Sequence, residues 1–348
     1  MRVVVIGAGP GGLTLAHGLR RAGIDVAVYE RDGELGRPQG ISLHIDERGM
    51  SALRACLPPA QAATVEATAG GLRERTLELS EVDGRLTVVG TRPSGALPGR
   101  QVHRPLLREV LLTGLGDVVR FGAEFERFEH RPDGTVGVWF ADGHTDTADV
   151  LVGADGIGST VRRQYLPDVR VVDTGRRMIM GATPLRAVDG TGLSELIGHD
   201  PASVRAGGTM MALGVLRFAE PQMVEDYVMW ALPVVRERLG SADPWVCAEE
   251  LAASLPSVLR TVVAEAWRDL TVALRIGTIP PMPPWQPGPV TLIGDAIHLA
   301  PGFGANLAMR DARWLSEALA EARRGDLLEA IGGYENTMRH HNFAAVTA

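Results

Sequence analysis

The sequence is poor in the residues that build covalent or metal-based frameworks. Cys56 and Cys247 are the only 2 cysteines among 348 residues. Two cysteines so far apart predict neither a disulfide framework nor a metal cluster, and they suit a reducing compartment. We therefore expect a cytoplasmic protein without a metal site.

Long apolar runs and an excess of positive charge are also missing. No stretch reaches the roughly 20 apolar residues that cross a bilayer, and no signal-peptide pattern precedes the first predicted strand. Asp and Glu number 42 against 35 Lys and Arg, which gives a formal net charge of −7 and argues against nucleic-acid binding. We expect no membrane and no nucleic-acid partner, and a monomer or homodimer that acts on a small molecule.

A glycine-rich turn stands at the beginning of the chain. The apolar run 2–7 leads into Gly7-Ala8-Gly9-Pro10-Gly11-Gly12, an amphipathic stretch follows to position 21, and a second apolar run ends in Glu30. Strand, glycine turn, helix, strand and acid is the βαβ fingerprint of a dinucleotide site. An accidental glycine turn is the alternative, and the motif alone does not separate FAD from NAD.

Each part of the fingerprint has a physical role. Gly7 permits a tight turn, Gly9 lets a pyrophosphate approach the backbone, and Gly12 lets the helix pack closely on the sheet. The helix directs its unpaired N–H groups and its positive dipole end at the phosphates. Glu30 is spaced to accept hydrogen bonds from a ribose diol.

Two later stretches repeat the pattern of a buried strand that ends in glycine and acid. One is 149–153 followed by Ala154-Asp155-Gly156, and the other is 290–293 followed by Gly294-Asp295. Ligands of open parallel sheets lie beyond the carboxyl ends of the strands. Three such ends can therefore converge on one long ligand.

The segments between these stretches have a different character. Short alternating runs in about 70–90 and 176–279 indicate an antiparallel sheet, and Pro280-Pro281-Met282-Pro283-Pro284 forms a stiff connector. We predict a discontinuous nucleotide-binding domain, with a sheet-rich substrate domain inserted into it. The expected boundaries are 1–69, 101–175 and 280–348 for the first domain, and 70–100 and 176–279 for the second.

Local signals place several elements. Asp46 is a suitable N-cap for a helix to position 57, which Pro58-Pro59 would end, and Pro132-Asp133-Gly134 marks the turn of a hairpin over 125–140. Further helices are expected over 105–115, 246–255, 257–267 and 306–324, and from 327 onwards.

Taken together, the three strand ends resemble the FAD-dependent aromatic hydroxylases of the para-hydroxybenzoate hydroxylase type, the group A flavoprotein monooxygenases. The resemblance covers nearly the whole chain. It implies an α/β fold with a Rossmann-like, GR2-type FAD-binding domain in three layers, an inserted β-sheet-rich substrate domain and a C-terminal helix. It also implies FAD as cofactor, NADPH or NADH as co-substrate, and dioxygen.

The resemblance assigns cofactor-binding roles to residues of this sequence. The glycine turn with Pro10 and Gly11 holds the pyrophosphate, Glu30 binds the adenosine ribose, and Asp295 after Gly294 binds a ribityl hydroxyl. The remaining predicted contacts are Arg31, Arg37, Arg104, Asp155, Gly156, Pro301, Gly304, Ala305, Asn306 and Leu307. No catalytic side chain is assigned.

Simpler interpretations of the same residues remain open. Asp155 and Asp295 could each cap the element that follows, and Arg37 and Arg104 could be surface arginines. His298 could pack beside its helix without proton chemistry. The Met210-Met211 pair and the tryptophans could belong to the core.

One loop departs from the family pattern. Between His298 and Gly304 the family usually has about three more residues and a second proline, where this chain reads Leu299-Ala300-Pro301-Gly302-Phe303. By resemblance this loop shapes the oxygen site over the flavin. The shorter loop therefore affects the expected retention of the flavin hydroperoxide at this site more than it affects the expected binding of FAD.

The resemblance implies hydroxylation of an aromatic or polycyclic, polyketide-like molecule through a flavin hydroperoxide. Only a cofactor can activate dioxygen, since ordinary side chains cannot. A flavin oxidase or reductase on the same fold is one alternative, and a non-catalytic FAD-binding protein is another. The Trp-x-Trp-x-Ile run of the related halogenases is absent from the sequence.

Overall fold

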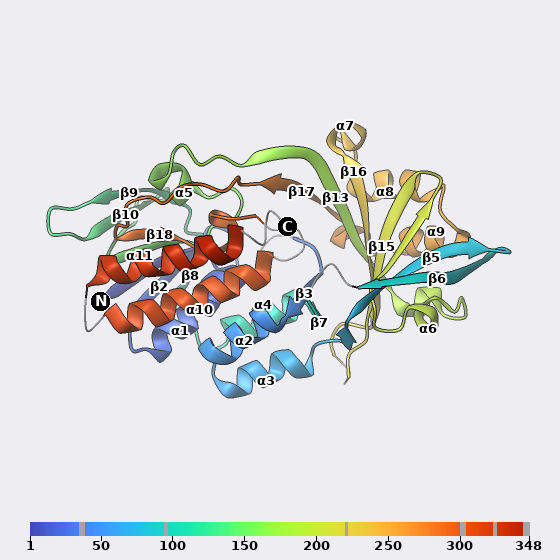
Figure 1. Ribbon diagram of the computed structural model, residues 1–348, viewed down its shortest axis with the longest axis horizontal. Coiled ribbons are helices and arrows are strands. Elements are labelled where there is room, and N and C mark those ends of the chain that lie inside the picture. Colours follow the sequence, from blue (N-terminus) through green and yellow to red (C-terminus); the bar gives the residue numbers. More distant parts are fainter. Residues whose placement is uncertain (35–38, 94–96, 220–221, 300–303, 323–325, 344–348) are drawn as a thin grey trace.

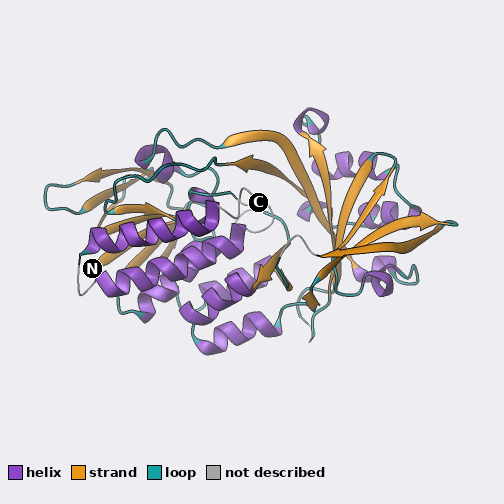
Figure 2. Cartoon of the chain, in the orientation of Figure 1, coloured by secondary structure: helices purple, strands orange, loops and turns teal. Residues whose placement is uncertain are grey.

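The computed structural model describes residues 1–34, 39–93, 97–219, 222–299, 304–322 and 326–343. The molecule is elongated, with a helix-rich lobe at one end and a sheet-rich lobe at the other (Figure 1 and Figure 2). Two strands, β13 Val172–Pro184 and β17 Val272–Thr278, run between the two lobes. Within the described residues, no helix is both long and apolar enough to cross a membrane.

A parallel sheet forms the centre of the helix-rich lobe. Its strand order is β18-β12-β1-β2-β8. The strands are β1 Arg2–Ile6, β2 Asp25–Glu30, β8 Val119–Phe121, β12 Val150–Gly153 and β18 Val290–Leu292. Val3, Val4 and Val5 are all fully buried, because layers cover both faces of this sheet. The continuous apolar runs in the sequence follow from that burial.

Helices cover one face of the parallel sheet and a small antiparallel sheet covers the other. Tyr29 of β2 packs against Phe140 of the antiparallel sheet, with ring centroids 4.2 Å apart. The strands of the antiparallel sheet are β9 Phe125–His130, β10 Val136–Phe140 and β11 Thr145–Ala148. The helices of the lobe are α1 Pro10–Arg21, α2 Glu47–Cys56, α3 Pro59–Ala67, α4 Arg104–Leu112, α5 Thr160–Tyr165, α10 Gly304–Ala322 and α11 Leu327–Met338. The predicted fold class, a three-layer α/β domain with an inserted sheet, is confirmed.

A seven-stranded sheet forms the second lobe, in the order β17-β13-β16-β15-β14-β5-β6. Only the pairing of β14 with β5 is parallel. The strands are β5 Arg75–Val82, β6 Arg85–Pro93, β13 Val172–Pro184, β14 Ala202–Ala206, β15 Thr209–Leu216, β16 Tyr227–Val235 and β17 Val272–Thr278. Trp230 and Ile179 on one face are buried in a core with residues of α8 Pro244–Ala252 and α9 Ser257–Ala264. The short helices α6 Leu193–Ile197 and α7 Arg236–Leu239 complete the lobe.

A three-stranded sheet between the lobes has the order β3-β7-β4. Its strands are β3 Ser42–Asp46, β4 Leu72–Arg73 and β7 Gly99–His103. The sequence patterns gave no sign of β7, and they missed α3. Pro58-Pro59 was interpreted as a helix end, but Pro59 is also a favourable first residue of the next helix.

Buried polar contacts fix the helix α11 against β18. Thr291 Oγ1 donates to Glu335 Oε1 (2.9 Å), and Tyr334 Oη donates to Leu292 O (2.8 Å). Glu335 is 1% exposed, and within the described part of the chain its Oε2 has no hydrogen-bond partner. Burial raises the pKa of the Glu335 carboxyl to about 7.

We predict that Glu335 makes stability fall as pH rises. The pKa is higher in the folded than in the unfolded chain, so the stabilising effect of the neutral carboxyl is complete below pH about 4.5 and is lost as pH rises through about 7. This group alone would cost up to about 3 kcal/mol of unfolding free energy between these limits. Chemical denaturation of Glu335→Gln at several pH values between 5 and 8 should show a flatter profile than the wild type.

The matched control is Glu329→Gln, which removes an exposed carboxylate from the same helix. It should leave the pH profile between 5 and 8 unchanged. Equal pH slopes in Glu335→Gln and the wild type would contradict the prediction.

Candidate functional site

The three strand ends predicted from the sequence lie side by side in register. Ile6 of β1 is paired with Gly153 of β12, and Gly153 is paired with Leu292 of β18. The residues that follow each strand therefore leave the sheet at one edge. The glycine turn, Asp155 and the Gly294-Asp295 turn all begin at this edge.

The glycine turn is shaped by close backbone packing around an open space. Gly7 has φ +111°, and a Cβ added there would lie 2.3 Å from Ala154 O. A Cβ at Gly12 would lie 2.0 Å from Gly7 O, so the helix packs tightly on the turn. A Cβ at Gly9 would have no neighbour within 4 Å. Gly9 is thus not required for packing, and the position beside it is open.

The beginning of α1 faces the same space. Gly9 is the N-cap, Pro10 is the first helical residue, and no side chain among the described residues caps this end. The first turn contains no acidic residue, and Arg20 and Arg21 lie in the last turn. The backbone N–H groups of the first turn can therefore bind an anion, as at other phosphate-binding helix N-termini.

The helix α10 joins the first and third strand ends. A Cβ at Gly11 of α1 would lie 3.0 Å from Ala308 Cβ, and a Cβ at Gly294 would lie 2.6 Å from the same atom. A Cβ at Gly304, where α10 begins, would lie 2.6 Å from Asp295 Oδ1. The N-termini of α1 and α10 and the Gly294-Asp295 turn consequently form one contiguous site. The predicted residues Ala305, Asn306 and Leu307 follow Gly304 in α10.

Glu30 lies at the end of β2 and supports the glycine turn. Its Oε2 accepts the Ala8 N–H (2.8 Å), and its Oε1 accepts the Asp32 N–H (2.9 Å). A carboxylate oxygen has a second lone pair, so both oxygens can still accept a bond from a ribose hydroxyl. Arg31 beside it is exposed, with Nε 3.7 Å from an oxygen of Asp32.

Asp155 has both a capping contact and an unused oxygen. Its Oδ2 accepts the N–H groups of Thr160 (2.7 Å) and Val161 (3.3 Å) at the start of α5. Its Oδ1 is buried and has no partner within the described residues, and burial raises the pKa of the carboxyl. The capping interpretation therefore accounts for one oxygen, and the other is enclosed by protein. Gly156, at φ +73°, turns the chain away from the sheet.

Charged groups from three other segments act on Asp295. Burial raises the pKa of this carboxyl and so does Asp311, whereas His298 and Arg104 lower it. Arg104 is the first residue of α4, and its Nη1 donates to Gln39 O (2.7 Å) while its Nη2 bonds Gln39 Oε1. Arg104 is therefore bound to the loop before β3, and its charge acts on the Asp295 carboxyl.

Three further predicted contacts are Arg37, Pro301 and Asn306. Arg37 and Pro301 lie outside the described residues, as does most of the shortened loop between His298 and Gly304. Asn306 is placed, but its side chain contacts protein: Oδ1 accepts the Asp46 N–H (3.0 Å) and Nδ2 donates to His44 O (2.8 Å). These bonds fix the start of α10 to β3.

Arg108 belongs to the site and was not predicted from the sequence. Its Nη1 donates to Ala8 O in the glycine turn (2.9 Å), and its Nε is buried without a partner among the described residues. It follows Arg104 by four positions, so both arginines lie on one face of α4. The four-residue spacing of the two arginines was the sequence pattern that could have predicted Arg108.

A chain of buried polar side chains at the junction of the lobes was also missed. Arg73 Nη2 bonds Gln101 Oε1, Gln101 Nε2 donates to Ser42 Oγ (2.8 Å), and Tyr227 Oη lies 3.2 Å from His103 Nδ1. Burial lowers the pKa of Arg73 to about 10 and that of His103 to about 4, and it raises the pKa of Tyr227. His103 is therefore neutral near pH 7, and its Nδ1 can accept the Tyr227 O–H. These residues come from β3, β4, β7 and β16, whose association no local pattern predicts.

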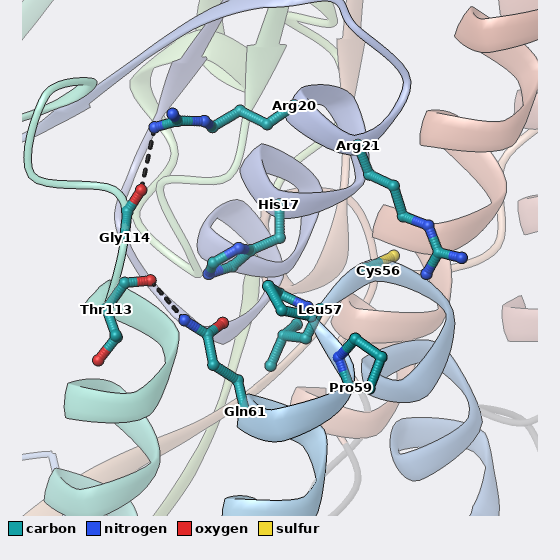
Figure 3. Close-up of a pocket in the computed structure, with 10 residues that line it drawn as sticks. His17, Arg20, Arg21, Cys56, Leu57, Pro59, Gln61, Thr113 and Gly114 are labelled. Carbon is teal, nitrogen blue, oxygen red and sulfur yellow. Dashed lines mark hydrogen bonds between the residues drawn. The ribbon is translucent and has the colours of Figure 1, made fainter.

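A cavity of about 470 Å³ opens at the other end of α1 (Figure 3). Arg20 Nη1 donates to Gly114 O (3.0 Å), and Gln61 Nε2 donates to Thr113 O (2.8 Å). The 12 residues of α1 place it about 18 Å from the glycine turn. It is therefore separate from the site at the strand ends.

The family model described as FAD binding domain matches residues 1–341. The chain belongs to this family. It is 32% identical over 393 residues to the dual O-methyltransferase/FAD-dependent monooxygenase CTB3 of Cercospora beticola, covering 97% of this chain and 44% of that protein. The phenazine 1,6-dicarboxylic acid hydroxylase PhzS of Lysobacter antibioticus is 30% identical over 385 residues, covering 99% of this chain and 88% of that protein. The chain thus spans less than half of CTB3 but most of PhzS.

The solved structures agree with the fold. The crystal structure of a candidate FAD-containing monooxygenase from Photorhabdus luminescens superposes with a TM-score of 0.82 at 29% identity, covering 100% of this chain and 96% of that chain. The cofactor of this family is FAD, and the site fits it. The open position beside Gly9 and the uncapped start of α1 would face the phosphates of the cofactor. Within the described residues, no cluster of His, Cys, Asp and Glu could hold a metal ion.

We predict that Gly9→Ala weakens FAD binding without loosening the fold. The added Cβ meets no protein atom within 4 Å, so it fills space at the turn without a clash. The Kd for FAD should rise about tenfold or more, because the backbone can no longer approach the pyrophosphate. Titration of the apoprotein with FAD measures this change. The control Gly116→Ala, at another open position, should leave both the Kd and the melting temperature unaltered.

We also predict that the Asp295 carboxylate contributes to FAD binding. Asp295→Ala should weaken FAD binding by about 1.5–3 kcal/mol, the value of a charge-assisted hydrogen bond to a hydroxyl. Asp295→Asn retains a neutral acceptor and should lie between the alanine variant and the wild type. Flavin affinity equal to wild type in both variants would favour the capping interpretation. Asp269→Ala, which removes an exposed carboxylate in the other lobe, is the control.

Proposed function

We propose that the protein is an FAD-dependent monooxygenase that uses NADPH or NADH and dioxygen to hydroxylate an aromatic or polycyclic small molecule. The FAD-binding domain would comprise residues 1–69, 101–175 and 280–348, and the substrate domain residues 70–100 and 176–279. The observation that carries the proposal is an apolar sheet face that meets the cofactor lobe at Gly40. A Cβ at Gly40 would lie 3.8 Å from Met180 Sδ and 3.9 Å from Leu274 Cδ1.

The strand register defines this apolar face. Directly paired residues share a face of a sheet, and Met180 is paired with Ala231, which is paired with Ala212. In the next row Ala182 is paired with Met229, and Met229 with Gly214. The face is opposite the one that packs on α8 and α9, and Met180 and Met229 are only partly buried on it.

The composition of the face favours a flat apolar guest. Three strands contribute alanine or glycine side by side at its centre, and methionines surround them. Alanine projects little from the sheet, and Arg73 Nη2 lies over Gly214, where an added Cβ would be 2.5 Å from it. Methionine adapts to irregular shapes and contacts aromatic rings favourably. The pair Met210-Met211 is divided between the two faces: Met211 belongs to the core with α8 and α9, and Met210 lies on the apolar face.

The relatives support the same substrate class. PhzS is named as a hydroxylase of a phenazine dicarboxylic acid, and another relative, at 31% identity over 350 residues, as the aurachin C monooxygenase/isomerase of Stigmatella aurantiaca. When bound, FAD supplies the oxidation of the nicotinamide and the activation of dioxygen. The side chains described here would bind the cofactor, orient the guest against it and exclude water. An oxidase or reductase of the same fold, or a non-catalytic FAD-binding protein, would use the same cofactor contacts.

We further propose a cytoplasmic location and a monomeric or homodimeric state. The 2 cysteines, both buried, suit a reducing compartment. Burial raises the pKa of the Cys56 thiol to about 11, so this cysteine is not a reactive thiolate near neutral pH.

We predict that NADPH or NADH oxidation is slow without substrate and rises when an aromatic guest binds. The guest would favour the conformation in which the nicotinamide reaches the flavin, a population shift driven by differential binding. The product should carry one oxygen atom from dioxygen. Turnover under ¹⁸O₂, with mass detection against a panel of phenolic and polycyclic compounds, measures both effects.

The alternatives give different results in the same assay. Unlabelled product with hydrogen peroxide formed in proportion to substrate consumed would identify an oxidase. A folded protein that binds FAD but consumes neither nicotinamide nor dioxygen with any panel member would favour the non-catalytic alternative.

A further inference from the structure

Asp311 of α10 is a buried carboxylate directly behind the Gly294-Asp295 turn. It is 0% exposed. Its Oδ2 accepts the Gly294 N–H (2.9 Å) and the His298 Nε2–H (2.6 Å), and its Oδ1 accepts Asn342 Nδ2–H (2.6 Å). A charge buried so deeply is stable only when donors surround it, and here three N–H groups do.

Asn342 reaches this carboxylate from a part of the chain far from the strand ends. It lies in the π-helical turn Arg339–Phe343 that follows α11, and it is also fully buried. Its Oδ1 accepts a hydrogen bond from Arg310 Nη2. Because arginine can only donate, this bond fixes the orientation of the amide and directs its N–H₂ group toward Asp311.

The contacts of Asp311 determine where the Gly294-Asp295 turn can lie. Gly294 has φ +58°, and a Cβ there would lie 2.6 Å from Ala308 Cβ, so the turn is pressed against α10 at the helical turn that precedes Asp311. The hydrogen bond from the Gly294 N–H and the bond from His298 hold the turn on both sides of Asp295. Asp295 is thereby presented beside Gly304 at the start of α10.

We infer that Asp311 and Asn342 are positioning residues of the flavin site: they fix the turn that presents Asp295, and they make the C-terminal turn Arg339–Phe343 part of the cofactor-binding structure. The inference rests on the proposed function, in which FAD occupies the strand-end site. In this arrangement Asp311 acts on the turn through Gly294 and His298, and Asn342 acts through Asp311.

A purely structural role for the cluster of Asp311, His298 and Asn342 predicts a different result. If the cluster only stabilises the fold, its variants lower the melting temperatures of the apoprotein and the FAD-loaded protein equally. If it positions Asp295, its variants also reduce the rise in melting temperature that FAD produces, because binding must first restore the turn.

The experiment uses Asp311→Asn and Asn342→Ala in the full chain. We measure the Kd for FAD by titration of the apoprotein, the melting temperatures with and without saturating FAD, and the reduction potential of the bound flavin. Asp311→Asn should raise the Kd about tenfold or more, the equivalent of one charge-assisted hydrogen bond, and Asn342→Ala should raise it less. In both variants the FAD-induced rise in melting temperature should shrink, and the potential should shift.

Asn336→Ala is the matched control, because Asn336 is exposed and bonds Arg339 in the same segment. It should leave the Kd and the potential unchanged. If Asp311→Asn does not fold, the measurements on Asn342→Ala test the inference alone. The inference is overturned if Asn342→Ala has the Kd and the reduction potential of the wild type, and if the melting temperatures of its apoprotein and its FAD-loaded form fall by equal amounts. A folded wild-type protein that takes up no FAD overturns the proposed function instead.

Discussion

The register of the parallel sheet is the constraint on which the rest of the site depends. Hydrogen bonds between β1, β12 and β18 place Ile6, Gly153 and Leu292 side by side. A shift of one residue in either pairing would reverse the faces of a buried strand, which the layers on both sides do not tolerate. The glycine turn, Asp155 and the Gly294-Asp295 turn leave the sheet shortly after these residues, so the core packing of the valine-rich strands also fixes the geometry of this part of the site.

The parts that the sequence predicted are those with local causes. The fingerprint at positions 7–12, the N-cap of α2 at Asp46 and the turn at 132–134 each depend on neighbours a few residues apart. Asp46 accepts the Arg48 N–H as its position indicated. The parallel strand ends were also predictable, because a buried apolar run that ends in glycine and acid is a local pattern with a consequence for the whole sheet.

The parts that the sequence did not predict depend on distant partners. The pairing of β3 with β7 joins residues 42–46 to 99–103, and the Asp311–Asn342 contact joins α10 to a turn beyond α11. The same is true of the polar chain through Gln101 and Ser42. A lone Gln or Asn gives no sign of its partner, since these residues are most often exposed, and only the folded chain shows which are buried and bonded.

The position of β18 has a consequence for the order in which the molecule can assemble. The fingerprint at the N-terminus can form its strand and helix early, but β12 must wait for β18, which follows it by some 140 residues that include most of the second lobe. During synthesis on the ribosome, the N-terminal half would therefore carry a parallel sheet whose β12 edge is unpaired and a phosphate site that is incomplete. With FAD bound as proposed, firm binding would require β18 and α10 to be in place, so cofactor loading would follow a late stage of folding.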